Sequence, residues 1–422
     1  MKVSLEALPA TDSKARAIGA AASFVSPDLP FLQADFWSRF KESFGWRGLA
    51  FRLSVSAMPD PGSSTTELRV LLRSLAGPLC FAYLPGGPAL DCPPDSRPEL
   101  LASLGAALRR HLPPFCLFIR FDPPWFEVEE GLAGEGEGPQ SPAPGQVPSE
   151  AAAGAPSRPT FSPPLRKAES DVQPPDSVFL DLHREEDEIL AGMKPKWRYN
   201  VRLAAKKGIL VSEEGLEGLP EFYRLYEETS RRDRIAIHPL AYYEKLFELA
   251  RAGGEGLGRP GLVDLRLWVA RHEGEAVAAI VTLYHGNRAT YLYGASSDSK
   301  RSLMPAYALQ WAAIMAARQN GCAIYDFYGI PPSEDPDHPM AGLYRFKTGF
   351  GGSIVHYAGS WDLPLSPALY ALWSLAESLR AFWFKKLKKR LGGGLSTLRK
   401  STGANGSPPA SAREASSQDS GT

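Results

Sequence analysis

The alternation of apolar and polar residues is clearest in the second half of the chain. Residues 263–271 alternate with the two-residue period of a β-strand, and residues 276–284 and 289–293 follow after turn sequences. Residues 304–320 repeat their apolar positions at helical spacing, and residues 323–328 return to a strand pattern. The pattern therefore predicts a three-stranded meander followed by a helix and a strand, in the order β-β-β-α-β.

The first half of the chain repeats this order more faintly. It predicts a helix, three strands, a second helix and a further strand, at residues 33–44, 48–57, 67–75, 79–84, 97–111 and 115–121. Each copy ends on an aspartate, Asp122 or Asp326, and paired prolines follow. The sequence thus indicates a duplicated unit, and 422 residues are enough for two domains.

The order of strands and helices is that of an acetyltransferase-like (GNAT) domain. We therefore expect the α/β class, with mixed sheets in two tandem GNAT-like domains at residues 1–126 and 172–364. Residues 127–171 are rich in Gly, Pro, Ala, Ser and Glu, and they are expected to form a disordered linker because such a segment cannot offset the entropy of ordering. Residues 392–422 have the same character and predict a disordered tail.

Charge and cysteine content limit the binding partners and the cellular compartment that we expect. Lys plus Arg and Asp plus Glu number 47 each, so any anion-binding surface must be local. The four cysteines form no C-x-x-C pair, which suits buried thiols in a reducing compartment. The N-terminus carries charges where a signal peptide needs an apolar run, and nowhere are 18 consecutive residues apolar. We therefore expect a cytoplasmic protein that is neither secreted nor membrane-spanning.

The acyl carrier is the next question. A GNAT domain that uses acyl-CoA needs a glycine-rich turn whose backbone N–H groups bind the pyrophosphate at a helix start. Here the corresponding turn, residues 301–306, has no glycine, and Pro305 removes one donor. The order of elements indicates N-acyl transfer, whereas the turn argues for a carrier other than coenzyme A. No zinc-hydrolase, serine-hydrolase or Walker pattern occurs in the sequence, and we expect neither a cofactor nor a metal.

Three segments carry candidate chemistry. Residues 194–207 (KPKWRYNVRLAAKK) hold six cations and no acidic residue, which suits contact with phosphates; the alternative is a solvated basic helix face. Residues 342–352 (GLYRFKTGFGG) set Lys347 where an ammonium can stabilise an oxyanion; the alternative is a surface loop. Arg232, near a helix end, either holds a phosphate or carboxylate or pairs with Asp233.

The pattern at residues 365–391 predicts an amphipathic, aromatic helix that closes with five basic residues. Such a helix can lie on anionic lipid headgroups, which would give peripheral contact with the inner face of the cytoplasmic membrane. The alternative is a helix packed on a domain, with its lysines favouring the C-terminal end of the helix dipole.

Together these motifs resemble the Fem-type peptidoglycan-bridge aminoacyltransferases, which build interpeptide bridges from aminoacyl-tRNA. The resemblance covers residues 31–362 apart from the linker. Six motifs carry it in the same order: LQADFWSRFKESFGW (32–46), FAYLPGGPAL (81–90), DLHREEDEILAGMKPKWRYNVRLAAKKGI (181–209), TSRRDRIAIH (229–238), YLYGASS (291–297) and GLYRFKTGFGG (342–352). About 25 residues separate His238 from Val263, too few for the coiled coil of some relatives, so the shorter branch is the one resembled.

The resemblance implies a cleft for a muramyl-peptide precursor and a channel for the aminoacylated end of tRNA. By motif position, Phe346 and Lys347 look like the catalytic pair, with Lys347 stabilising the oxyanion. The resemblance also implies substrate contacts by six further residues: Lys41, Arg232, Tyr293, Arg198, Asn200 and Arg202. In relatives the first domain is completed by a stretch that the Pro/Gly/Ala-rich segment replaces here, and the helix at residues 365–391 returns to pack on that domain.

We therefore expect transfer of glycine, alanine or serine from aminoacyl-tRNA to the side-chain amine of the stem peptide. The acceptor would be lipid II or UDP-MurNAc-pentapeptide. The proton acceptor is open: Asp122 and Asp326 are candidates, and structural roles at strand ends are the alternative for both. Two other functions also stay open, an acyl-CoA-dependent N-acyltransferase of the same fold and an inactive protein that binds precursor or RNA.

Overall fold

The structure, a computed structural model, describes residues 1–8, 29–56, 63–129, 158–252, 263–379 and 383. Met1–Pro367 form one compact unit, and Ala368–Thr422 form a second, of which residues 368–379 are helical. The packing of residues 365–391 on the first domain therefore stays a prediction, and the tail at 392–422 lies outside the described residues. Within the part of the chain that is described, no helix has the length and apolar character needed to cross a bilayer.

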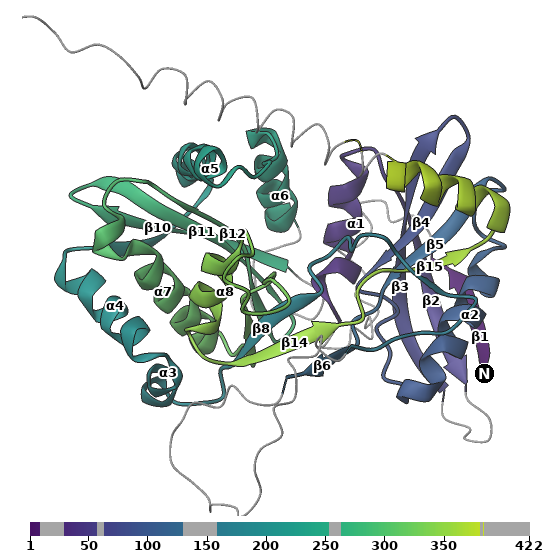
Figure 1. Cartoon of the computed structure of the whole chain (residues 1–422), viewed down its shortest axis with the longest axis horizontal. Helices are drawn as coiled ribbons and strands as arrows, with labels where there is room; N and C mark the ends of the chain where they lie inside the picture. The colour runs from purple at the N-terminus through teal and green to yellow at the C-terminus, as the bar shows by residue number, and fades with distance from the viewer. Residues whose placement is uncertain (9–28, 57–62, 130–157, 253–262, 380–382, 384–422) are drawn as a thin grey trace, which may run out of the picture. The chain divides into compact units, whose positions relative to one another are not determined.

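The first unit holds two mixed sheets, and the sheet nearer the N-terminus has seven strands (Figure 1). Its strands in spatial order are β1 (Lys2–Ala7), β2 (Arg47–Ser56), β3 (Ser63–Ala76), β4 (Leu79–Pro85), β5 (Cys116–Asp122), β15 (Trp361–Pro364) and β7 (Arg166–Lys167). Only β4 and β5 pair in parallel, and α2 (Arg97–Leu108) connects them. This is the β-β-β-α-β order that the sequence predicts for the first half.

The second sheet has eight strands. In spatial order they are β6 (Phe126–Val128), β14 (Ser353–Tyr357), β8 (Asp176–Asp181), β13 (Ile324–Asp326), β12 (Arg288–Ser296), β11 (Glu275–His285), β10 (Val263–His272) and β9 (Leu210–Glu214). The single parallel pair is again the one joined by a helix, β12 and β13 through α7 (Pro305–Gln319). The two sheets therefore repeat one arrangement, and the prediction of two tandem GNAT-like halves is confirmed.

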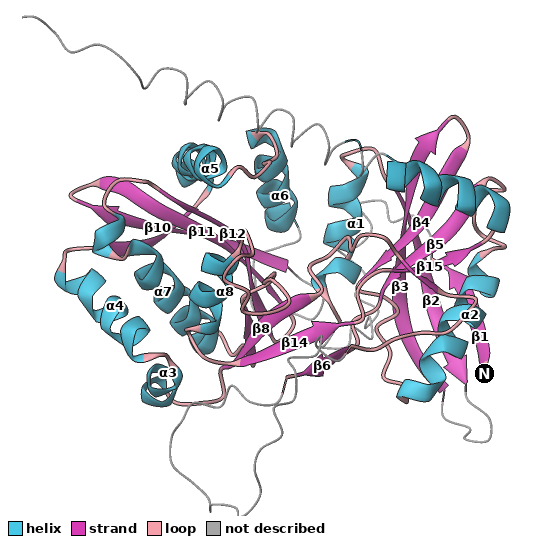
Figure 2. Ribbon diagram, viewed as in Figure 1, coloured by secondary structure: helices cyan, strands magenta, loops and turns pink. Residues whose placement is uncertain are grey.

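Helices cover both faces of the second sheet (Figure 2). One face packs on α3 (Glu186–Gly192), α4 (Pro195–Lys206), α7 and α8 (Ala341–Thr348), and the other on α5 (Leu219–Asp233) and α6 (Leu240–Ala252). Along β11 the side chains alternate between them: Ala278 and Ile280 join the first layer, and Ala279 and Val281 join the second. Because both faces are buried, β11 is apolar along nearly its whole length.

Local turn chemistry explains why the predicted boundaries hold. Glu273 and Gly274 both have positive φ, 53° and 83°, which matches the two-residue hairpin turn between β10 and β11. Gly321, with φ of 76°, follows the end of α7 in the left-handed conformation that lets a helix stop. These turns fix the register in which the buried faces of the strands align.

Each half contributes one strand to the sheet of the other half. β6 follows the first half in sequence but pairs with β14 in the second sheet. β15 follows the second half but pairs with β5 in the first sheet. The sequence does not show which residues form the last strands of the first domain. Residues 361–364 form one of them, as β15. Neither half completes its sheet alone.

The predicted linker at residues 127–171 needs correction at its described ends. Residues 130–157 lie outside the described part of the chain, but β6 begins at Phe126, and β7 lies in the first sheet. Leu165 and Ala168 are buried, and Leu165 belongs to the core of the first half. Disorder is therefore wrong for residues 158–171, because apolar side chains within a polar, proline-rich composition have a core to enter.

A shared apolar cluster joins the halves. α1 (Asp35–Glu42) supplies Trp37 and Phe40, which pack with α6 and with β10 to β12 of the second half. The rings of Phe40 and Tyr242 lie 4.7 Å apart in an edge-to-face contact. Full burial of a side chain such as Phe40 stabilises the fold by about 2 kcal/mol, so this cluster holds the two sheets in one unit.

The exchanged strand β15 is also anchored by a buried ion pair. Arg120 donates from Nε and Nη2 to the two carboxylate oxygens of Asp362, at 2.7 and 2.8 Å. Replacing Asp362 with Ala removes the carboxylate that accepts two hydrogen bonds from the buried Arg120, and it should lower the free energy of unfolding in urea by roughly 3 to 5 kcal/mol. Glu6→Ala, which breaks the exposed Arg52–Glu6 pair, is the control and should cost about 1 kcal/mol or less. Equal effects of the two substitutions would contradict the anchoring role.

Candidate functional site

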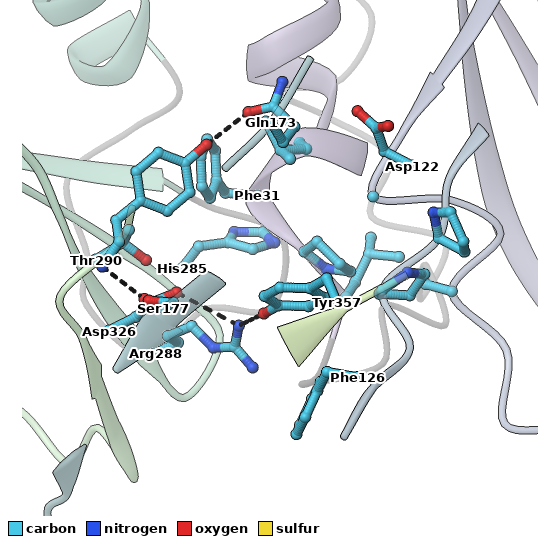
Figure 3. A pocket seen from close by; sticks show the side chains of 18 of the residues that line it. Phe31, Asp122, Phe126, Gln173, Ser177, His285, Arg288, Thr290, Asp326 and Tyr357 are labelled. Carbon is cyan, nitrogen blue, oxygen red and sulfur yellow. Dashed lines mark hydrogen bonds and ion pairs between the residues drawn. The ribbon is translucent and has the colours of Figure 1, made fainter. Parts of the chain in front are cut away.

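A cavity of about 460 Å³ lies between the first and second halves of the first unit (Figure 3). The first half contributes residues 29–32, 86, 89–91, 122–124 and 126, and the second half contributes side chains of β8, β11, β12, β13 and β14. Residues 173–175, on the segment that enters the second half, and the loop residues 287, 328 and 359 also line it. The lining is mostly apolar with a few polar groups, as in small-molecule sites.

The two strand-end aspartates of the duplicated unit both line this cavity. Asp122 accepts hydrogen bonds from the hydroxyls of Tyr83 and Ser360, and burial raises its pKa to about 6. Asp326 accepts from the hydroxyl of Ser177 and from the N–H of Tyr328, and burial likewise raises its pKa. The paired motifs in the sequence thus meet at one site.

A chain of hydrogen bonds crosses the site from one half to the other. The Tyr83 hydroxyl donates to Asp122, and Gln173 Nε2 donates to Tyr83 Oη at 3.0 Å. The Tyr328 hydroxyl then donates to Gln173 Oε1 at 2.6 Å, which is the dashed contact at Gln173 in Figure 3. One amide therefore connects the buried Tyr83 of β4 with the half-buried Tyr328 that follows β13, and its two ends fix the orientation of both rings.

Lys347 lies on α8 and is 5% exposed. Its Nζ donates to the carbonyl oxygens of Phe327 at 2.6 Å, Gly329 at 3.0 Å and Tyr328. It also lies 5.0 Å from the centre of the Tyr291 ring. Burial lowers the pKa of Lys347 to about 7, with the nearby Asp326 opposing the shift. The surface-loop alternative is therefore excluded, and the ammonium sits directly behind Tyr328 of the cavity wall.

Phe346 holds the helix that carries Lys347. Its ring packs edge-to-face on Tyr307 of α7 and on Phe350, with centroids 5.3 and 5.2 Å apart. Its carbonyl oxygen accepts a 2.9 Å hydrogen bond from Trp197 Nε1 of α4. α4, α7 and α8 are thereby fixed around the predicted catalytic pair.

Lys41 and Tyr293 lie in the aromatic cluster shared by the halves. Lys41 Nζ is 4.6 Å from the Trp37 ring centre and 5.8 Å from that of Tyr242, and burial lowers its pKa to about 8. The Tyr293 ring lies 5.3 Å from Tyr243, and burial raises its pKa well above the ordinary value. The structure brings these two predicted contacts to the same cluster.

Arg232 sits at the end of α5 and is held by internal contacts. Its Nη1 donates to the Ser296 carbonyl and to Asp298, both at 2.9 Å, and its Nε donates to Asp233 at 2.9 Å. The helix-end salt bridge that the sequence leaves open is therefore formed. Contact of Arg232 with a substrate stays a prediction.

The three residues predicted on the basic helix α4 have different environments. Arg198 donates to the carbonyls of Ala191 and Met193 at 2.6 and 2.7 Å, which caps the end of α3. Asn200 is buried on α4. Arg202 is exposed, so it is the member of this group best placed for an external anion.

The start of α7 bears on the choice of acyl carrier. Met304 precedes the helix with a φ of 61°, and Pro305 occupies its first turn. The N–H groups of Tyr307 and Ala308 point back to the Met304 carbonyl, at 3.1 and 3.5 Å. No glycine opens this helix, so it lacks the backbone features of a pyrophosphate cradle.

Comparison with known proteins shows which family the chain belongs to. A family model described as the FemAB family matches residues 26–249 and 269–378, which is most of the chain. The chain belongs to the FemAB family.

Individual relatives of this FemAB member are distant. The lipid II:glycine glycyltransferases of Staphylococcus saprophyticus and Staphylococcus aureus are each 24% identical to it, over 253 and 258 residues. Those alignments cover 48% of this chain and 61% of each relative, so the chain spans less than two thirds of their length. A crystal structure of FemX is 20% identical and has a TM-score of 0.62, over 82% of this chain and 96% of that one. That likeness establishes the fold.

Sequence reasoning missed several residues of the FemAB member's cavity. Gln173 falls just after the segment taken as linker, and Arg288 and Tyr357 lie on strands without a motif. The repeated Asp-and-proline motif was the one available signal, since it marks where both parallel strand pairs end.

The raised pKa of Asp122 predicts a dependence of stability on pH. The native state keeps a proton between pH 3.8 and about 6 that the unfolded chain has released, so this group makes the free energy of unfolding fall as pH rises through that window. Asp122→Asn cannot titrate. The free energy of unfolding of Asp122→Asn, relative to that of wild type, should therefore rise by on the order of 2 kcal/mol between pH 4 and pH 7, measured by urea unfolding.

The exposed Asp187→Asn is the matched control for this measurement, and it should show no comparable gain. A pH-independent difference between wild type and Asp122→Asn would contradict the assignment of a buried, proton-holding carboxyl.

Proposed function

We propose that this protein transfers an aminoacyl group, with glycine as the first candidate, from aminoacyl-tRNA to the side-chain amine of a peptidoglycan stem peptide. Membership of the FemAB family and relatives named lipid II:glycine glycyltransferase support the reaction class. The observation that carries the proposal is a buried lysine behind a cavity that both halves of the first unit line.

The chemistry proceeds in two steps. The acceptor amine attacks the carbonyl carbon of the ester that links the amino acid to tRNA, and a tetrahedral intermediate with one negative oxygen forms. The carbon–oxygen bond to the ribose then breaks, the amide remains, and the ribose hydroxyl leaves with a proton that originates on the amine. The protein's contribution is to orient both substrates and to stabilise the oxygen on which charge develops.

Lys347 is the proposed source of that stabilisation. Its three N–H donors are directed at the carbonyls of residues 327–329, and one of these contacts is exchanged for the oxyanion in the transition state. A buried cation acts strongly on a developing charge because little water screens it. Its lowered pKa reflects the same burial, and a nearby oxyanion would favour its protonated form.

The two substrates approach from different sides. The acceptor peptide occupies the cavity that contains Asp122 and Asp326, either of which can accept the proton from the amine and pass it to the leaving ribose oxygen. The tRNA contacts the exposed face of α4, where Lys196, Arg202 and Lys206 are all exposed and Tyr199 is 62% exposed. Glycyl-tRNA and either lipid II or UDP-MurNAc-pentapeptide are thus the proposed partners.

The direct test is incubation of the full chain with a mixed pool of charged tRNAs and a muramyl-pentapeptide acceptor, followed by mass measurement of the product. The proposal predicts the addition of one aminoacyl residue that requires charged tRNA. Acyl transfer from acetyl-CoA without tRNA would instead establish the alternative carrier, and the absence of any product with either donor would contradict the proposal.

Replacing Lys347 with Met tests the catalytic role. Loss of a cation that acts mainly in the transition state should lower kcat about 10²-fold or more, with little change in acceptor affinity. Lys245→Met on α6 is the control lysine, and it should leave kcat unchanged. Circular dichroism of both variants checks folding, and an unchanged kcat in a folded Lys347→Met variant would exclude the role.

Reversing one charge on α4 tests the tRNA surface. Arg202→Glu should raise KM for aminoacyl-tRNA several-fold, since it removes a phosphate contact. The slope of log KM against log salt concentration should fall by about one, because one counterion fewer is released on binding. The kcat at saturating tRNA should stay the same. Arg110→Glu, which changes another exposed arginine after α2, is the matched control, and an equal effect of the two changes would rule out a specific surface.

A further inference from the structure

Gln173 lies on the segment that leads from β7 in the first sheet to β8 in the second. Its backbone is fixed on both sides. The N–H of Val172 donates to Ser360 Oγ at 2.9 Å, and Pro174 follows, which restricts the residue before it to an extended conformation. The side chain of Gln173 lines the cavity between the halves, where Figure 3 labels it. An amide on a fixed backbone is thus placed in the cavity wall.

The hydrogen bonds of Gln173 have a fixed direction. The Tyr83 hydroxyl has one proton, which it donates to Asp122, so it can only accept from Gln173. Nε2 of the amide therefore faces Tyr83, and Oε1 faces Tyr328, whose hydroxyl donates to it at 2.6 Å. A side chain at this position must donate at one end and accept at the other, which an amide does and an ionised carboxylate does not.

On the side of the second half, the chain of contacts ends at Lys347. Tyr328 donates from its hydroxyl to Gln173, and its carbonyl accepts from Lys347 Nζ. The neighbouring Gly329 also accepts from Lys347, at 3.0 Å. A Cβ at Gly329 would lie 3.2 Å from Pro174 Cγ, so there is no room for a side chain between them. Gln173 and Pro174 therefore lie directly against the backbone that holds the ammonium.

On the side of the first half, the chain of contacts ends at Asp122. One carboxylate oxygen accepts from the Tyr83 hydroxyl, and the other accepts from the Ser360 hydroxyl. Gln173 contacts the first of these hydroxyls through its side chain, and Val172 contacts the second through its backbone N–H. Both donors to Asp122 are thus held by the same short segment.

We propose that Gln173 is a positioning residue, which holds Asp122 and Lys347 at a fixed separation. It acts through the hydroxyls of Tyr83 and Tyr328 and on no reacting atom. The inference rests on the proposed function, in which Asp122 can move the proton and Lys347 stabilises the oxyanion. These groups act on the nitrogen and the oxygen of one tetrahedral intermediate, so an error of about 1 Å in their placement can cost on the order of 10²-fold in rate.

The experiment measures steady-state kinetics of the full chain with charged tRNA and a muramyl-pentapeptide acceptor. Gln173→Leu is similar in size but has no hydrogen-bonding group, and it should lower kcat about tenfold while KM for the acceptor stays within about twofold of wild type. Gln173→Glu can accept from Tyr328 but, when ionised, cannot donate to Tyr83, so it should lower kcat as well. Gln319→Leu, at an exposed glutamine of α7, is the control and should leave kcat unchanged.

A double-mutant cycle tests the connection itself. Tyr83→Phe and Tyr328→Phe each remove one hydroxyl of the chain, and once one link is broken the loss of the other should cost less. Together they should lower kcat at least about threefold less than the product of their single effects. In the Gln173→Leu background the two changes should be additive, because the amide that connects the hydroxyls is gone. A merely structural role of Gln173 would leave this coupling unchanged.

An unchanged kcat in a Gln173→Leu variant that circular dichroism shows to be folded would overturn the inference. Independent effects of the two tyrosines in wild type, or coupling that persists without the amide, would overturn it too. A raised KM for the acceptor with unchanged kcat would do the same, since Gln173 would then be a substrate contact. If Gln173→Leu does not fold, Gln173→Glu takes its place in both measurements.

All these results would leave the proposed function in place. Failure of wild type to transfer an aminoacyl group from charged tRNA would instead count against the proposed function itself, and the inference would fall with it.

Discussion

The rest of the structure depends on the hydrogen bonds that hold the buried ammonium of Lys347. Lys347 is removed from water, and the three carbonyls of residues 327–329 replace its hydration. To present them, the chain turns sharply after β13, with Tyr328 at a φ of 49°. Strain of this kind persists only where surrounding contacts determine it, and here Gln173 holds the Tyr328 hydroxyl while Lys347 holds its carbonyl. The position of Tyr328 in the cavity wall and the position of the Lys347 ammonium therefore determine each other.

The exchange of strands keeps that unit aligned with the first half. β6 lies in the second sheet, β15 lies in the first, and the buried Arg120–Asp362 pair anchors β15 against β5. The aromatic cluster of α1 and α6 adds a second connection. Because the cavity is lined from both halves, its geometry needs both connections, and a duplicated fold gains a site that neither copy forms alone.

Much of the fold follows from local pattern. The meanders, the crossover helices α2 and α7, and the aspartates that end the parallel pairs were all predicted, since each depends on periodicity or turn chemistry within a few residues. The pairings of β15 and β6 were not, because no local signal states which sheet a strand joins. Arg198 shows why the site is harder to predict than the fold. Its charge suggests contact with a substrate anion, whereas in the structure it donates hydrogen bonds to carbonyls at the end of α3. The burial of Lys347 likewise depends on segments far apart in sequence.

The measurement that tests the account most directly is an NMR titration of Lys347 in protein labelled with ¹³C at lysine Cε, with the signal assigned by its absence from a Lys347 substitution. Loss of hydration on burial predicts a titration midpoint near 7. A midpoint near the ordinary value of 10.5 would mean that the ammonium is solvated, and the proposed oxyanion site would be contradicted.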